Sequence, residues 1–140
     1  KQGNGVHLIQ KLISELKLND NVKLMLDIDE KTKNLLYYNS NLLLMPSWFE
    51  GFGNSVLEAM SFGTSSLVSR YGASPEVIGD SGLIINQITS KEIYKKLLFF
   101  AHLSKKEKSK LISLSFSRAY TKFSFDSRKE NLLKILNEKT

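Results

Sequence analysis

The sequence predicts an α/β domain in which a doubly wound parallel sheet is followed by extra helices at the C-terminal end. Two observations predict this class. Between residues 6 and 85, helical stretches alternate with short runs that are too apolar to have a solvent-facing side, as in a sheet covered on both faces. After residue 86, three helical segments follow one another without a strand. We therefore expect one domain over residues 1–140, with the alternating part at about 1–86 and the C-terminal helices at 87–140.

The alternating part begins with a helix at 6–17, where four apolar residues fall on one face: Ile9, Leu12, Ile13 and Leu16. A compact apolar run at 22–26 has the length of a strand, and 30–38 predicts the next helix. The run LLLM at 42–45 predicts a strand that stops at Pro46. Crossovers between such parallel strands are expected to be right-handed.

The second half of the alternation contains a helix at 54–62, which Gly63 ends in the position of a left-handed C′ glycine. Ser74 and Pro75 have the residue types of an N-cap and a first-turn proline, so they predict a short helix that runs to residue 78. The remaining strands are expected at 64–69 and 83–85.

The C-terminal part predicts three helices, at 91–103, 105–119 and 125–136, with Ser90 and Ser104 as N-caps of the first two. Its charge differs from that of the rest of the chain. Residues 1–90 carry seven Lys or Arg against nine Asp or Glu, a net of −2, whereas residues 91–140 carry thirteen against five, a net of +8. Solvated lysine-rich helix faces explain this charge, because leucine and isoleucine are interleaved at helical spacing. We expect no nucleic-acid partner, and contact with an anionic membrane surface is a second hypothesis.

Composition excludes several classes of protein. The 140 residues are 41% hydrophobic, which is enough for a buried core, and they include no cysteine, so neither a disulfide framework nor a thiolate metal site can form. The longest apolar runs are far shorter than the roughly 20 residues of a membrane-spanning helix. His7 and His102 are each isolated, so no metal site is expected. We expect a cytoplasmic location, either free or peripheral to the inner face of the membrane.

The stretch PSWFEGFGNSVLEAMSFG at 46–63 connects the end of a predicted strand to the start of a predicted helix. Ligands of doubly wound sheets bind where such loops leave the carboxyl ends of the strands. Gly51 and Gly53 allow the backbone to approach a ligand closely. The free N–H groups that open the helix, on Asn54, Ser55 and Val56, form an anion site that suits a phosphate or diphosphate.

Two glutamates flank this anion site. Glu50 precedes the helix, and Glu58 lies one turn inside it on the face of the helix mouth. A carboxylate near a diphosphate cannot neutralise it, so these groups are more suited to accept hydrogen bonds from sugar hydroxyls. One carboxylate for a hexose and one for a ribose would describe a nucleotide-sugar. The alternative is purely structural, because glycine-rich loops before helices are common and glutamate is a good helix former.

The double-glutamate stretch, together with GASPEVIGDSGLIIN at 72–86 and NDNVKLML at 19–26, resembles the retaining glycosyltransferases of the GT-B fold, family 4, also called glycosyl transferases group 1. Their signature is E-x7-E within a PS-x-x-EGFG-x-x-x-x-EAM-x-x-G frame. The resemblance covers about residues 3–135 and implies the C-terminal, Rossmann-like, nucleotide-sugar-binding domain. It implies transfer of a hexose from an NDP-sugar to a glycan or glycolipid acceptor, without a metal or other cofactor.

The resemblance also implies roles for individual residues. It makes Glu50 the candidate catalytic residue, which contacts hydroxyls of the donor hexose. The positions implied to face the hexose and the diphosphate are Gly51, Phe52, Gly53, Asn54, Ser55 and Val56. Glu58 corresponds to the ribose-binding glutamate, and Asp27 and Ile28 fall where the family contacts the base. UDP-, GDP- and ADP-sugars are all compatible with these residues.

Some features depart from the family pattern. The segment GTSSL at 63–67 lacks the usual proline and puts hydroxyls on a buried strand, and Leu26 replaces a usual glycine. We expect the acceptor-binding N-terminal domain, and the Arg and Lys that hold the diphosphate in the family, to lie outside these 140 residues, so the isolated chain should be inactive. Two alternatives stay open: another GT-B enzyme, such as a glycogen-synthase-like or sugar-phosphate synthase, and a non-catalytic α/β binding domain.

Overall fold

The computed structural model describes residues 4–137 of the chain. Its contacts divide the chain into two compact units, Lys1–Thr32 and Lys33–Thr140, which we describe separately. That residues 1–140 act as one domain stays a prediction. Within residues 4–137, the helices are all too short or too polar to cross a membrane.

The first unit contains α1 (Asn4–Glu15), two residues offset from the predicted helix. The helix ends where Lys17 adopts a left-handed conformation, with φ of 54°. The strand predicted at 22–26 is wrong, because these residues form no strand and pair with none of the strands in the described part of the chain. A short apolar run becomes a strand only where a neighbour completes its hydrogen bonds. The carboxylate of Asp29 then caps α2 (Glu30–Asn39) by accepting a 2.7 Å hydrogen bond from the Thr32 N–H, which lowers the Asp29 pKa.

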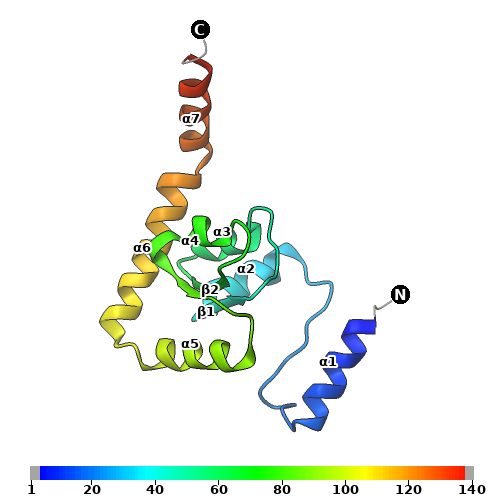
Figure 1. The fold of residues 1–140 in the computed structure, drawn as a ribbon. Helices are drawn as coiled ribbons and strands as arrows, with labels where there is room; N and C mark the ends of the chain where they lie inside the picture. The colour runs from blue at the N-terminus through cyan, green and yellow to red at the C-terminus, as the bar shows by residue number, and fades with distance from the viewer. Residues whose placement is uncertain (1–3, 138–140) are drawn as a thin grey trace. The chain divides into compact units, whose positions relative to one another are not determined.

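The second unit is built on a parallel sheet of β1 (Leu42–Met45), β2 (Ser65–Ser69) and β3 (Leu83–Ile85), adjacent in chain order. The register pairs Leu44 with Leu67, and Leu67 with Leu83. The central strand β2 is buried along its whole length. The three strands and the parallel direction confirm the predicted fold class in this part of the chain (Figure 1).

The helices that follow β1 in this unit are α3 (Asn54–Ser61), α4 (Ser74–Ile78), α5 (Ser90–His102), α6 (Lys105–Phe123) and α7 (Phe125–Asn137), with a 3₁₀ turn at Gly79–Ser81. α3, α4 and α6 contact β2, and α5 contacts β3 (Figure 1). The core is where α3 and α4 meet the sheet and α6, and its buried members are Val56, Met60, Val68, Val77, Ile78 and Ala119. α6 is four residues longer than predicted, and the predicted order of helices after β3 is confirmed.

The predicted helix caps are only partly correct. Gly63 has the expected left-handed conformation, with φ of 77°, and Ser104 forms a full capping box with Glu107. Ser90 is not a cap, because Thr89 has the extended backbone and its hydroxyl accepts the Glu92 N–H. Ser74 is also not a cap, since it is the first helical residue of α4 and is buried.

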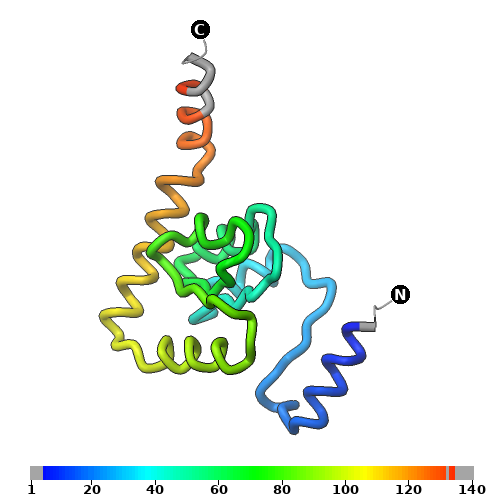
Figure 2. The backbone as a smooth tube through the Cα atoms, in the orientation of Figure 1, coloured from blue at the N-terminus to red at the C-terminus, as the bar shows by residue number. Residues whose placement is uncertain are grey.

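The loops that follow β1 and β2 are held together through their backbones. A Cβ built on Gly72, where φ is +76°, would lie 2.6 Å from the carbonyl oxygen and 2.7 Å from the nitrogen of Glu50. The Ala73 N–H donates a 3.0 Å hydrogen bond to that same carbonyl. At the base of the loops, the Ser69 hydroxyl donates to the carbonyl of Ser47. The course of both loops can be followed in Figure 2. We call the contacts of Gly72 and Ala73 with Glu50, together with the bond from Ser69 to Ser47, the loop clamp.

The C-terminal half of α6 supports the same region. The Arg118 guanidinium donates to the carbonyls of Val77 at 2.8 Å and Glu76 at 2.7 Å, which satisfies carbonyls of the short helix α4. Gly79 leaves room for this side chain, since a Cβ there would lie 2.6 Å from the guanidinium carbon. Phe123, at the end of α6, meets Phe52 of the β1 loop edge to face, with ring centroids 6.0 Å apart.

Hydroxyl groups on β2 replace the apolar side chains expected of a buried strand. Ser65 Oγ lies 3.5 Å from Ser115 Oγ, and Ser115 donates a 3.0 Å bond to the carbonyl of Ser81. Among the described residues, Ser66 Oγ is the buried side-chain polar atom without a hydrogen-bond partner. Burial of an unpaired hydroxyl costs stability, so β2 is weaker than an all-apolar strand would be.

Replacement of Ser66 by alanine is expected to stabilise the protein. The change removes a buried hydroxyl that has no partner and should add about 1 kcal/mol to the free energy of unfolding, or roughly 3 °C in Tm. Ser65→Ala is the matched control, because it removes a hydroxyl that has a partner and should lower Tm. Calorimetric unfolding measures both, and a lower Tm for Ser66→Ala would contradict the unpaired state of this hydroxyl.

Replacement of Gly72 by alanine is expected to destabilise the protein. The left-handed conformation costs a non-glycine residue about 1–2 kcal/mol, and the new methyl group must also push the Glu50 backbone away. Gly51→Ala is the control, since a Cβ at Gly51 meets no atom within 4 Å. Unfolding in urea should show a large loss for the first variant and little change for the second. Equal effects would show that the loop clamp leaves room for a side chain.

Candidate functional site

The helix mouth of α3 has the conformation that the motif predicts. Gly53 precedes the helix with φ of 89°, a left-handed conformation, and it makes no side-chain cap. The first N–H groups of a helix have no partner within the helix, so those of Asn54, Ser55 and Val56 are available at this end. Val56 contributes only its backbone, because its side chain is fully buried in the core. The result is a helix end that is open to an anion.

Glu50 lies beside this helix mouth. The loop clamp fixes its backbone, and its Cγ is 3.7 Å from the position of a Cβ on Gly53. The hydroxyl of Ser74 is 3.1 Å from that same position, a contact between α4 and this loop that no sequence motif predicted. A Cβ at residue 53 would lie tightly against the Ser74 hydroxyl and in ordinary contact with Glu50, in a backbone conformation that side chains rarely adopt. The structure brings Glu50, Gly53 and the start of α3 together.

Glu58 lies on the second turn of α3 and contacts α2. Its Oε2 receives an ion pair from Lys33 Nζ at 3.0 Å and a hydrogen bond from the Tyr37 hydroxyl at 3.3 Å. The side chains are partly open to solvent, 40% for Glu58 and 27% for Lys33. Sequence analysis missed both partners. Lys33 and Tyr37 are four residues apart and so lie on one face of the helix predicted at 30–38. The sequence did not indicate that this face packs against α3.

Tyr37 is itself held firmly. Its ring stacks with that of Phe62 at a centroid distance of 6.2 Å, and its carbonyl accepts a 2.5 Å bond from the Thr64 hydroxyl. Burial raises the pKa of its phenol above the usual value, while a hydrogen bond with the Ser55 side chain opposes that rise. The phenol therefore keeps its proton at neutral pH and serves as a donor to Glu58.

The residues predicted to contact the base belong to the first unit. Asp27 is exposed and has a left-handed backbone, with φ of 49°, and Ile28 is also exposed. Their role as base contacts stays a prediction. The neighbouring Asp29 serves as the cap of α2. Within residues 4–137, no three His, Cys, Asp or Glu side chains gather in a way that could hold a metal ion.

Aromatic and basic side chains extend the carboxyl edge of the sheet. Trp48, which is 70% exposed, follows β1, and its ring centroid is 5.5 Å from that of Tyr71 in the loop after β2. The guanidinium of Arg70 lies over the Tyr71 ring at 5.9 Å. These rings and this cation therefore lie on the loops that follow β1 and β2, the same loops that the loop clamp joins.

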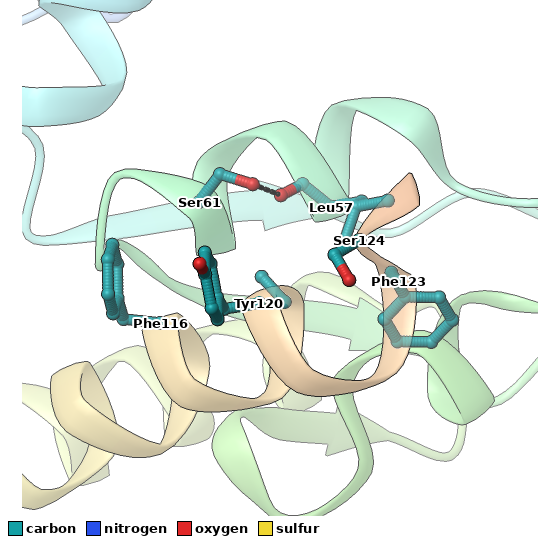
Figure 3. A pocket seen from close by; sticks show the side chains of 7 residues that line it. Leu57, Ser61, Phe116, Tyr120, Phe123 and Ser124 are labelled. Carbon is teal, nitrogen blue, oxygen red and sulfur yellow. Dashed lines mark hydrogen bonds between the residues drawn. The ribbon is translucent and has the colours of Figure 1, made fainter. Parts of the chain in front are cut away.

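A groove between α3 and α6 is a separate feature (Figure 3). It has a volume of about 180 Å³, and its lining residues are Leu57, Ser61, Phe116, Ala119, Tyr120, Phe123 and Ser124. Figure 3 shows the rings of Phe116 and Tyr120 on one side and the hydrogen bond from Ser61 to the Leu57 carbonyl on the other. The lining has no charged side chain and none of the predicted site residues. It is therefore unsuited to a diphosphate.

The arrangement at the α3 mouth can bind a ligand that combines an anion with hydroxyl groups. The helix end supplies N–H donors and a positive dipole, and the carboxylates of Glu50 near this end and of Glu58 on the second turn supply hydrogen-bond acceptors. A simple phosphate would use only the first of these, whereas a sugar linked to a phosphate would use all of them.

Comparison with known proteins gives the family. The model of the family "Glycosyl transferases group 1" matches residues 2–115, which is most of the chain. The MMP alpha-(1->4)-mannosyltransferase of Mycolicibacterium hassiacum is 33% identical over 84 residues, which are 60% of this chain and 20% of that protein. The chain thus spans about a fifth of the length of this relative.

Two solved structures share the fold. Sucrose-phosphate synthase from Thermosynechococcus elongatus superimposes with a TM-score of 0.82 at 21% identity, covering 100% of this chain and 36% of that one. The catalytic domain of Starch Synthase IV from Arabidopsis thaliana, bound to ADP and acarbose, has a TM-score of 0.76 at 20% identity, covering 94% of this chain and 29% of that one. These likenesses confirm the predicted GT-B type of α/β fold, and with the family match they show that the chain belongs to the glycosyl transferases group 1.

Proposed function

We propose that this chain binds the nucleotide-sugar donor of a retaining hexosyltransferase of family 4, which transfers a hexose to a glycan or glycolipid acceptor. One observation carries the proposal. The helix α3 begins at the left-handed Gly53, close to Glu50, and carries a second carboxylate, Glu58, on its second turn. Family membership supports transfer chemistry, and the mannosyltransferase relative supports a hexose as the transferred group.

In this proposal the diphosphate lies at the α3 mouth. The N–H groups of Asn54, Ser55 and Val56 and the helix dipole oppose its charge, while the backbone of residues 51–53 faces the hexose. Gly53 supports this placement because its left-handed backbone turns the chain from the loop into the start of α3. The ADP in the Arabidopsis starch synthase supports a nucleoside diphosphate as the product of the reaction.

Glu50 is the proposed catalytic residue. Its carboxylate would accept hydrogen bonds from the donor hexose and stabilise positive charge that builds up at the anomeric carbon as the diphosphate leaves. The acceptor hydroxyl would attack on the face from which the diphosphate departs, which retains the configuration. The loop clamp supports this role, because it fixes the Glu50 backbone in advance of substrate binding.

Glu58 is the proposed ribose contact, with Asp27 and Ile28 proposed for the base. UDP-, GDP- and ADP-sugars all fit this proposal, which requires no metal. We also propose that the basic C-terminal helices place the enzyme at an anionic membrane surface, since residues 91–140 carry a net charge of +8 (thirteen basic minus five acidic).

Substitution of the two glutamates by glutamine should separate their roles. Thermal shift with UDP, GDP, ADP and their sugar conjugates is expected to show stabilisation of the wild type by one nucleotide series. Glu58→Gln should lose stabilisation by the free diphosphate, because the ribose contact is lost. Glu50→Gln should keep that stabilisation and lose the increment that the sugar adds.

Glu15→Gln is the control for this series, because Glu15 lies on the exposed surface of α1, where it forms an ion pair with Lys11 at 3.6 Å. This control should respond to nucleotides like the wild type. If no nucleotide stabilises the wild type, the proposal is wrong, and the non-catalytic binding domain becomes the better explanation.

Co-sedimentation with liposomes tests the membrane proposal. Binding should rise with the fraction of anionic lipid and fall with added salt, because screening weakens attraction between the basic helices and the surface. The charge-neutral control is a liposome of phosphatidylcholine alone. Equal binding to both liposomes would remove the electrostatic argument.

A further inference from the structure

The carboxylate of Glu58 is occupied on one side only. Lys33 Nζ at 3.0 Å and the Tyr37 hydroxyl at 3.3 Å both reach Oε2. A carboxylate oxygen has two lone pairs, so these two donors fill the acceptor capacity of that atom. The other oxygen, Oε1, is the one left for a ligand. The orientation of the carboxylate is thus set by the protein before any ligand arrives.

Both donors come from one face of α2. Lys33 and Tyr37 are one turn apart, and the ring stack with Phe62 and the bond from Thr64 fix Tyr37 against α3 and the start of β2. The raised pKa of the Tyr37 phenol keeps it a donor through the neutral range. Loss of either donor would leave Glu58, a partly exposed side chain, held by a single contact and able to turn more easily toward solvent.

We propose that Lys33 and Tyr37 are positioning residues that aim one oxygen of Glu58 at the ribose, and so determine how strongly the site prefers a ribonucleotide to its 2′-deoxy form. The inference rests on the proposed ribose contact of Glu58. A carboxylate that the protein already holds in place loses little conformational entropy when it accepts a hydrogen bond from a hydroxyl. A mobile carboxylate must first be ordered, which weakens binding. The positioning pair therefore strengthens each hydrogen bond that the ribose makes.

Lys33 has a second effect in this proposal. Lys33, on α2, places a positive charge beside Glu58. Glu58 belongs to α3, whose N-terminus is the proposed diphosphate site. Without Lys33, the carboxylate would repel the diphosphate more strongly. As an ion pair that is partly open to solvent, it contributes little to folding, so variants at this position should remain folded.

The test compares binding of a nucleoside diphosphate and its 2′-deoxy form by calorimetry, with the base that the wild type binds best. Tyr37→Phe and Lys33→Met should each weaken the ribonucleotide about tenfold, the effect of losing one hydrogen bond to a charged group. The 2′-deoxy form should weaken less, so the preference for ribose falls at least twofold. A general loss of folding would affect both ligands equally and leave that ratio unchanged.

Matched controls lie on the same helix. Tyr38→Phe removes a phenol hydroxyl from a largely exposed ring, and Lys31→Met removes an exposed charge of the same sign. Both should keep the wild-type ratio. In a Glu58→Gln background, Tyr37→Phe should change the dissociation constant less than twofold, because its partner is already altered.

The outcomes separate the two proposals. If Glu58→Gln abolishes the preference for ribose while Tyr37→Phe and Lys33→Met retain it, the positioning role is overturned and the ribose contact stands. An undiminished effect of Tyr37→Phe in the Glu58→Gln background also overturns the positioning role. If the wild type binds no nucleotide or shows no preference for ribose, both proposals are wrong.

Discussion

The close contact between the backbones of Gly72 and Glu50 is the constraint on which the rest of the site depends. It leaves no space for a side chain at residue 72, and it joins the loops that follow β1 and β2 into one rigid edge. Because the β1 loop leads directly into α3, the same contact fixes the direction in which the helix mouth opens. A parallel sheet supplies only the starting points of these loops, and their meeting creates the surface that a ligand would face.

Much of the fold could be predicted from the sequence because β1 and β3 are short apolar runs, and β2, despite its three serines, lies between two segments of helical periodicity. Gly63 and Ser104 were predictable because each acts within its own turn. The errors have the opposite origin. Residues 22–26 have the composition of a strand, but pairing with a neighbour decides whether a strand forms. Thr89 competes with Ser90 as a cap, and backbone angles decide between them.

The site divides in the same way. The motif identified the helix mouth, the left-handed glycine and both glutamates, because these lie within nine consecutive residues, 50–58. It gave no information on Tyr37 or Lys33, which approach Glu58 from a helix about twenty residues earlier. The contact of Ser74 with Gly53 was equally invisible. Each of these contacts depends on how two elements pack against each other. Hydrophobic periodicity predicts single elements and does not indicate which elements are neighbours.

The support that α6 gives to the site has a consequence for the order in which the chain can fold. Arg118 bonds to carbonyls 41 and 42 residues earlier in the sequence, and Phe123 meets the ring of Phe52. A chain made from its N-terminus therefore contains the whole motif well before it contains the helix that braces it. Until α6 leaves the ribosome, the carbonyls of Glu76 and Val77 lack the hydrogen bonds from Arg118. Phe52 likewise lacks its contact with the ring of Phe123. The loop that contains Glu50 and Phe52 is thus synthesised early in this unit, but it gains its contact with α6 only after that helix has been made.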